Sequence, residues 1–288
     1  MNKKLLVCTF SGGRTSAFMG QFLNAYDKYK DHDKVFLFAN TGKEKEETLE
    51  FINQCDEQWG LGVIWLEAVV DPEKGVGTKH RVVDFKSASR NGEPFKEMLK
   101  KYPLPTVFGS SCTRELKQRP MDSYVKSLGY DEIITAVGIR YDERHRKSLN
   151  ADKQGFIYPL CDDIKVDSNF IRTWWDKQCF DLKLKDYEGN CDLCFKKSLR
   201  KRLTILKEDA KAGEWWKEME EEYGSEKVPR FDLRNNLTIK QIIELSKLPF
   251  DLVKDKHEIG KQQTSLFGEL MDIELDMDGE TDCFCKAS

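Results

Sequence analysis

A short glycine-rich segment near the start of the chain has the residue types of a phosphate-binding loop, Ser11-Gly12-Gly13-Arg14-Thr15-Ser16. Paired glycines let backbone amides approach an anion without interference from Cβ atoms. Ser11 and Ser16 add hydroxyl donors, and Arg14 adds positive charge. The segment matches neither Gly-x-x-x-x-Gly-Lys-Ser/Thr nor Gly-x-Gly-x-x-Gly, which argues against a P-loop NTPase and a dinucleotide site. A glycine-rich turn without a ligand is the alternative.

Cysteines form a second set of residues that could do chemistry, nine in all. Cys191 and Cys194 make a Cys-x-x-Cys pair, a spacing that lets two thiolates bind one metal. Cys112 lies at the expected start of a helix, where the helix dipole favours the thiolate. Cys161 is the candidate fourth ligand, and Cys283 or Cys285 is the alternative if the end of the chain folds back. The residues leave an iron–sulfur site, a zinc site and a pair without metal as alternatives.

The other cysteines are not part of a recognisable metal-binding or catalytic motif. Cys8, Cys55 and Cys179 are expected to be small buried residues, and Cys283 and Cys285 lie near the end of the chain. Many thiols without a recognisable export signal indicate a reducing compartment, so we expect a cytoplasmic protein. No apolar run approaches the roughly 18 residues that cross a bilayer, and no membrane association is expected.

Regular elements in the first half of the chain must position these residues. Apolar runs predict strands at 5–10, 35–39, 62–66 and 132–137, and helical spacing predicts helices at 15–29, 44–59, 94–101 and 113–128. This alternation is typical of βαβ units, so the predicted fold is a doubly wound, mostly parallel α/β sheet. The glycine-rich segment then lies at the carboxyl edge of the sheet and at a helix N-terminus, where anionic ligands bind.

Three regions are predicted along the chain. Residues 1–160 form the α/β domain, residues 161–253 a helical part with the Cys-x-x-Cys pair, and residues 254–288 an acidic, mobile tail. Within the α/β domain, residues 71–90 lose periodicity and are predicted to form a long functional loop that carries Lys79, His80 and Arg81.

Four motifs, in order and spacing, resemble the phosphoadenylylsulfate (PAPS) reductase family of the adenine nucleotide alpha-hydrolase-like superfamily, also called PP-loop or N-type ATP pyrophosphatase proteins. Residues 11–16 are similar to the PP-loop, and residues 40–48 to the Asp-Thr-Gly…Glu-Thr block. Residues 111–120 resemble the block with a cysteine and Lys-Pro, and residues 138–146 the Gly-x-Arg-x-x-Glu-Ser…Arg block.

The sequence departs from this family at three places. Thr15 stands where most ATP-using members have Asp, and Ser111-Cys112 stands where many PAPS reductases have a Cys-Cys pair. The terminal Glu-Cys-Gly-Leu/Ile-His motif is absent, with Asp282-Cys283-Phe284-Cys285 in a similar place. These departures put PAPS reductase activity in doubt but not the fold.

The resemblance implies a site for ATP or a related adenine nucleotide, with Mg²⁺ bridging its phosphates. The nucleotide-binding candidates are Ser11, Gly12, Gly13, Arg14, Thr15, Ser16, Asn40, Thr41, Gly42, Gly138, Arg140 and Arg144, and the catalytic candidates are Cys112 and Arg140. By analogy with related sulfur enzymes, a [4Fe-4S] cluster is expected on Cys112, Cys191, Cys194 and Cys161, with zinc as the alternative.

We expect an enzyme of sulfur metabolism that adenylates an acceptor with ATP and transfers sulfur with the help of this cluster. The first alternative is a thiol-dependent phosphoadenylylsulfate or adenylylsulfate reductase. The second is a nucleotide-binding module that kept the fold and lost the chemistry. The sequence does not identify the acceptor or the sulfur donor.

Charge adds information about partners. The chain has 47 Lys and Arg against 50 Asp and Glu, a net charge of −3, so bulk electrostatics favour neither nucleic acid nor membrane. The basic run Lys196–Arg202 is either a solvated helix face or an anchor for a nucleic-acid acceptor. Arg140, Arg144 and Arg146 suit phosphate or sulfate. A sulfur donor or reductant protein is a further expected partner, and a homodimer stays open.

Overall fold

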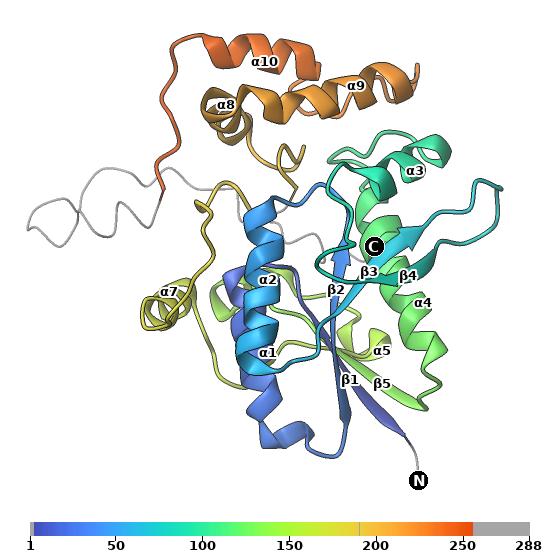
Figure 1. Ribbon diagram of the computed structural model, residues 1–288, viewed down its shortest axis with the longest axis vertical. Coiled ribbons are helices and arrows are strands. Elements are labelled where there is room, and N and C mark those ends of the chain that lie inside the picture. The colour runs from blue at the N-terminus through green and yellow to red at the C-terminus, as the bar shows by residue number, and fades with distance from the viewer. Residues whose placement is uncertain (1–2, 190, 256–288) are drawn as a thin grey trace, which may run out of the picture. The chain divides into compact units, whose positions relative to one another are not determined.

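The computed structural model describes residues 3–189 and 191–255 of the 288-residue chain (Figure 1). These residues divide into two compact units. The first contains residues 3–98 and 112–183, and the second contains residues 99–111 and 184–255. The predicted tail at 254–288, with Cys283 and Cys285, lies almost wholly outside the described residues.

A six-stranded sheet in the order β4-β3-β2-β1-β5-β6 forms the first unit. Its strands are β1 Lys4–Thr9, β2 Asp33–Asn40, β3 Ile64–Val69, β4 Lys79–Val83, β5 Glu132–Ala136 and β6 Phe156–Ile157. All neighbouring pairs are parallel except β3 and β4. Val7 of β1 pairs in register with Val35 of β2 and with Thr135 of β5. The chain winds from β1 outwards to β4 and then returns to β5 on the other side of β1, so the strand order reverses between β1 and β5.

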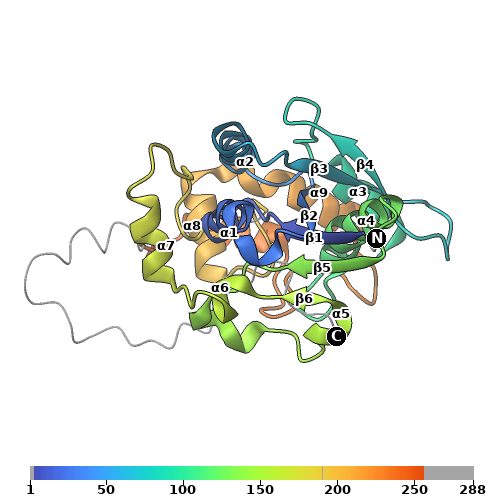
Figure 2. The same ribbon diagram turned by 90° about the horizontal axis from the view of Figure 1, so that it is seen from below.

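Helices cover both faces of this sheet. The first-unit helices are α1 Arg14–Ala25, α2 Glu46–Trp59, α4 Arg119–Ser127, α5 Ala151–Gln154, α6 Pro159–Asp162 and α7 Ser168–Trp175, with short 3-10 turns at Asp27–Tyr29 (η1) and Tyr141–Arg146 (η3). Figure 2 shows α1 and α2 on one side of the sheet and α4 on the other. On the α4 face, Met121 and Val125 pack against inward side chains of β1, β2 and β3. The predicted doubly wound α/β fold is confirmed.

A π-helical segment, η2 Thr113–Gln118, leads directly into α4. Together they account for the predicted helix at 113–128, and Cys112 immediately precedes the segment. π-Helical turns inside helices are rare and occur frequently at functional sites. The wider turn places Glu115, Leu116 and Lys117 in the protein interior.

Two sequence-based expectations in the first unit are wrong. Residues 79–83, expected in a loop, form β4, an edge strand whose side chains are mostly exposed and therefore show no apolar run. Cys179, expected to be buried in a helix, is exposed because α7 ends at Trp175. Cys8 and Cys55 are buried, as predicted.

The second unit is helical. It contains α8 Leu199–Glu208, η4 Ala210–Gly213, α9 Glu214–Tyr223 and α10 Ile239–Lys247, and α3 Glu93–Lys101 spans the boundary between the two units. Trp216 and Phe231 pack edge to face with ring centroids 5.2 Å apart. Arg202 donates to Asp232 at 2.6 Å, and both side chains are almost completely buried. The predicted helical, cysteine-bearing C-terminal part is thus present.

Candidate functional site

The glycine-rich segment connects β1 to α1 at the point where the strand order reverses. The hydroxyl of Ser16 organises the turn, because Oγ accepts from the backbone N–H of Ser11 at 3.1 Å and from the Ser11 hydroxyl at 3.0 Å. It also donates to the carbonyl oxygen of Gly13 at 2.9 Å. The turn is therefore held closed around one buried hydroxyl. Its position is the one at which open α/β sheets bind ligands.

Gly12 is required by the geometry of this turn. Its φ of +84° lies in the left-handed region, and a Cβ atom built there would be 2.5 Å from Cγ2 of Thr48. Gly13 differs, since its φ is −99° and a Cβ would meet only the Ser11 hydroxyl at 3.9 Å. Gly138, after β5, approaches the same turn: a Cβ on Gly138 would be 3.6 Å from Cα of Ser16. Two of the sequence motifs thus lie side by side.

Arg14 forms hydrogen bonds with residues 181 and 182, near the C-terminal end of the first unit. Its Nε and Nη2 donate to the two carboxylate oxygens of Asp181 at 2.7 and 2.9 Å, and Nη2 also donates to the carbonyl of Leu182 at 2.6 Å. The backbone carbonyl of Arg14 accepts from the indole N–H of Trp175 at 3.0 Å. The charge that the sequence offers to a phosphate is therefore paired with a carboxylate in this structure.

Arg140 takes a place beside the phosphate loop. Its Nη1 donates to the hydroxyl of Thr15 at 3.0 Å, so the guanidinium lies at the start of α1. Asp142 and Glu143 hold it there, with Nε 3.1 Å from Asp142 Oδ1 and Nη2 3.3 Å from Glu143 Oε2. Arg140 is only 12% exposed, which makes it a positioned cation rather than a mobile surface one. Thr15, the residue that departs from the Asp of ATP-using relatives, is the group it touches.

The other two arginines of this motif have different surroundings. Arg146 forms an ion pair with Glu143 and is largely buried. Arg144 is exposed, and its guanidinium lies over the ring of Tyr141, 5.0 Å from the centroid. Of the three, Arg140 contacts the loop at 11–16, through the hydroxyl of Thr15.

The block after β2 forms a compact polar turn. Glu44 accepts from the backbone N–H of Thr41 at 2.9 Å and from its hydroxyl at 2.8 Å, and Asn40 Oδ1 accepts from the N–H of Gly42 at 3.1 Å. The other oxygen of Glu44 is 3.6 Å from Nζ of Lys117, and both side chains are buried. Lys117 comes from the π-helical segment, so two of the motifs meet at this turn.

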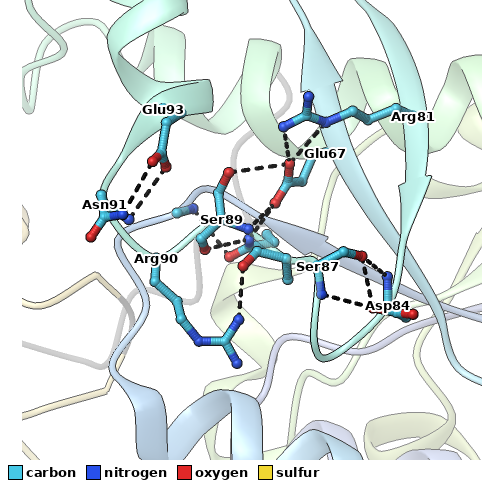
Figure 3. A network of polar contacts seen from close by, with 11 residues as sticks. Glu67, Arg81, Asp84, Ser87, Ser89, Arg90, Asn91 and Glu93 are labelled. Carbon is cyan, nitrogen blue, oxygen red and sulfur yellow. Dashed lines mark hydrogen bonds and ion pairs between the residues drawn. The ribbon is translucent and has the colours of Figure 1, made fainter.

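A buried carboxylate that the sequence did not single out lies under this turn. Glu67 of β3 is fully buried and accepts from Asn40 Nδ2 at 2.7 Å, from the N–H of Ser89 at 2.6 Å and from Arg81 of β4 at 3.0 Å (Figure 3). Arg90 of the same loop pairs with Glu46 at 2.7 Å. Glu67 thereby fixes the loop at 84–93 against the carboxyl end of β2. Its only sequence signal is a charged residue directly after an apolar strand run.

The candidate metal ligands are divided between the units. Cys112 and Cys161 belong to the first unit, and Cys191 and Cys194 to the second. Cys161 packs with Val137, Ile139 and Tyr158, and burial raises the pKa of its thiol. Within residues 3–189 and 191–255, no group of three or more His, Cys, Asp or Glu side chains is placed to hold a metal ion. The described residues of neither unit provide a full ligand set for the cluster.

Lys197 organises the Cys-x-x-Cys turn. Its ammonium donates to the carbonyl oxygens of Gly189 and Cys191, at 2.5 and 2.8 Å. Arg202, the last residue of the basic run, is in the buried pair with Asp232. Two of the cations considered for a nucleic-acid anchor therefore stabilise the second unit. In the described part of the chain, no helix is both long enough and apolar enough to span a membrane.

Comparison with known proteins agrees with the arrangement of these motifs. Residues 5–151 match the model of the phosphoadenosine phosphosulfate reductase domain family. An uncharacterized nin region protein, ORF290, of Escherichia phage lambda is 33% identical over 199 residues, which cover 68% of this chain and 67% of the phage protein. An uncharacterized protein of Methanocaldococcus jannaschii is 27% identical over 146 residues, which cover 51% of this chain and 25% of that protein.

Proposed function

The chain belongs to the phosphoadenosine phosphosulfate reductase domain family, and on this premise we propose that it binds ATP or a related adenine nucleotide at the loop 11–16. The family is one of nucleotide-binding proteins of sulfur metabolism and is generally enzymatic. The observation that carries the proposal is Gly12, whose positive φ and contact with Thr48 leave no room for a side chain in the turn before α1. A glycine is needed there to bring the backbone amides of the loop towards an anion.

The neighbouring motifs supply the rest of the proposed site. Ser11, Gly13 and Ser16 contribute the loop, Gly138 lets β5 approach it, and Arg140 places a guanidinium beside Thr15. A guanidinium can bind two oxygens of a phosphate or sulfate at once. Asn40, Thr41 and Gly42 form the adjacent edge of the sheet and are the candidates for the nucleoside.

We propose ATP-dependent adenylation followed by sulfur transfer as the reaction. An acceptor oxygen forms a bond to the α-phosphorus while the bond to pyrophosphate breaks. A hydrosulfide ion supplied by the sulfur donor then forms a C–S bond to the activated carbon while the C–O bond breaks, and AMP leaves with that oxygen. Loop amides and Arg140 stabilise the negative charge that develops on the phosphate oxygens. Mg²⁺, when bound, neutralises the phosphates.

The proposal also assigns a metal-binding role to the cysteines. Cys112, Cys191 and Cys194 are the candidate ligands of a [4Fe-4S] cluster, with Cys161 as the fourth candidate and zinc as the alternative. These cysteines belong to two different units, and the reaction proposed above does not require the cluster. Iron and acid-labile sulfide in anaerobically prepared protein, lost in Cys112→Ala and in Cys191→Ala, would support the cluster. Protein without iron would exclude it, and stoichiometric zinc would select the alternative.

A sulfonucleotide reductase is a second candidate, and Thr15 favours it. The loop 11–16 contains no carboxylate to help hold Mg²⁺ on a triphosphate, and the hydroxyl of Thr15 instead accepts from Arg140. The two reactions are separated by their products. AMP and pyrophosphate released from ATP support adenylation, whereas sulfite released from PAPS with a thiol donor supports reduction. Binding of nucleotide without either product would support a module that has lost the chemistry.

A further inference from the structure

An exposed aromatic residue directly follows Arg140 of the proposed nucleotide site in the chain. Tyr141 opens η3 and is 40% exposed, although its backbone N–H is fixed by the carbonyl oxygen of Val166 at 2.8 Å. The preceding residue is Arg140, whose guanidinium reaches Thr15 of the phosphate loop. The backbone that carries the ring is therefore fixed, and Tyr141 belongs to the same unit as the loop.

Two cations flank this ring. The guanidinium of Arg144 lies 5.0 Å, and the ammonium of Lys165 6.0 Å, from the ring centroid. Both side chains are exposed, and neither forms an ion pair among the residues that the structure describes. Lys165 has a φ of +49°, an uncommon conformation for a residue with a side chain. We name Tyr141, Arg144 and Lys165 the Tyr141 platform.

The carboxylates close in sequence to the Tyr141 platform have partners of their own. Asp142 binds Arg140 at 3.1 Å, Asp163 binds Lys28 at 2.6 Å, Asp162 binds Lys147 at 2.7 Å, and Asp167 caps α7 by accepting from the N–H of Phe170 at 2.8 Å. The positive charge of the platform is therefore not cancelled by these neighbours. An exposed ring with two uncompensated cations is complementary to a ligand that has both flat bases and phosphates.

We propose that the Tyr141 platform binds a single-stranded nucleic acid as the acceptor in the reaction proposed above, on which this inference rests. A base stacks on the outer face of the Arg144 guanidinium, which itself lies over the Tyr141 ring, while Lys165 meets a flanking phosphate. Such stacking tolerates any base, so binding is not specific for sequence. The nucleic acid then passes the edge of the sheet at which Arg140 holds the nucleotide phosphates.

We favour this surface over the basic run at 196–202 as the nucleic-acid contact. Lys197 and Arg202 of that run are used inside the second unit, by backbone carbonyls and by Asp232. Arg144 and Lys165 have no comparable internal function. A single-stranded ligand is favoured over a duplex because the bases of a duplex are stacked on each other and cannot reach an aromatic ring.

The test is fluorescence anisotropy with labelled oligothymidylate and oligouridylate of about 12 nucleotides, and with a duplex of the same length. We expect Tyr141→Ala to raise the Kd of the single strands about tenfold and Tyr141→Phe to leave it near the wild-type value. Arg144→Ala and Lys165→Ala should each lower the slope of log K against log salt by about 0.7. Lys126→Ala is the matched control, since Lys126 is an exposed cation in the last turn of α4, before the amino end of β5, whereas Tyr141 follows the carboxyl end of that strand.

Nucleotide binding is measured separately, with a non-hydrolysable ATP analogue, on the same variants. Unchanged ATP-analogue binding by Tyr141→Ala and Lys165→Ala, together with weakened oligonucleotide binding, supports the inference. Wild-type protein that binds the ATP analogue but no oligonucleotide overturns the inference alone, whereas failure to bind the ATP analogue counts against the proposed function. Equal loss in Lys126→Ala, equal binding of duplex, or full binding by Tyr141→Ala also overturns it. Binding of either sugar supports it, and the ratio of the two Kd values identifies DNA or RNA.

Discussion

Gly12 is the residue on which the conformation of the phosphate loop depends most directly. Replacing it with Ala would force a side chain into left-handed backbone and place Cβ 2.5 Å from a methyl group of Thr48. We expect Gly12→Ala to lower the free energy of unfolding by about 1–3 kcal/mol and to weaken binding of ATP. Chemical denaturation and calorimetric titration measure the two effects.

Gly13→Ala is the matched control for this prediction. Its φ of −99° suits any residue, and its Cβ would meet only the Ser11 hydroxyl, at 3.9 Å. The free energy of unfolding should therefore change by less than about 0.5 kcal/mol. Equal destabilisation by the two alanines would show that the strain assigned to Gly12 is not what sets the loop.

Asp181 controls whether Arg14 is available to a ligand. In Asp181→Ala the guanidinium loses both carboxylate contacts, at 2.7 and 2.9 Å, and is free to turn towards bound phosphates. We expect the Kd of ATP to fall about threefold to tenfold, because a charge-assisted hydrogen bond to the ligand is gained. Asp152→Ala, which removes an exposed carboxylate from α5, should leave the Kd unchanged. A weaker affinity in Asp181→Ala would instead mean that the Arg14–Asp181 pair is needed to shape the loop.

At the scale of elements, the π-helical segment η2 contributes a buried carboxylate to the first unit. Glu115 accepts hydrogen bonds from the hydroxyl of Thr78 and from Nε of Arg114. Burial alone would raise the pKa of Glu115, but these hydrogen bonds and the charge of Arg114 outweigh burial and hold the pKa below its ordinary value. The ionised form is therefore the one that the fold stabilises.

The sign of the pH dependence follows from this lowered pKa. Ionised Glu115 contributes stability above the pKa of the unfolded chain, and this contribution is lost as the pH falls through the lower folded-state pKa. We expect Glu115→Gln to be less stable than wild type by about 1–3 kcal/mol at pH 7. The difference should shrink as the pH falls below about 4. Urea denaturation of both proteins across this range is the measurement, and a difference independent of pH would contradict it.

The sequence predicted the strands that have apolar runs and missed those that lack one. β1 and β2 have continuous apolar runs because most of their residues are buried, and β5 has an apolar run although only Ala136 in it is buried; the predicted bounds of all three are correct within about two residues. β4 has mostly exposed side chains, so only its hydrogen bonds to β3 define it. The ion pair between Arg14 and Asp181 could not be predicted from the sequence, because the two residues are 167 positions apart in the chain. Only the tertiary structure brings such residues together.

At the scale of the whole molecule, the cysteines of the first unit range from fully buried to exposed. Cys8 in β1 and Cys55 in α2 are 1% and 0% exposed, whereas Cys179, beyond the end of α7, is exposed. Burial raises the pKa of Cys8 to about 12, and burial also raises the pKa of Cys55. The reacting thiolate is consequently scarce at both core positions at neutral pH.

Alkylation of the intact chain therefore reports on global unfolding. With iodoacetamide at pH 8, followed by peptide mapping, we expect Cys179 to react in the native state. Cys8 and Cys55 should react at least about a thousandfold more slowly, because each needs both exposure to solvent and a lower pKa. In concentrated guanidinium chloride the three rates should converge, which controls for intrinsic reactivity. Rapid labelling of Cys55 in the native state would contradict its place in the core. Labelling of Cys8 and Cys55 at one common slow rate would show that β1 and α2 unfold together in a single cooperative event.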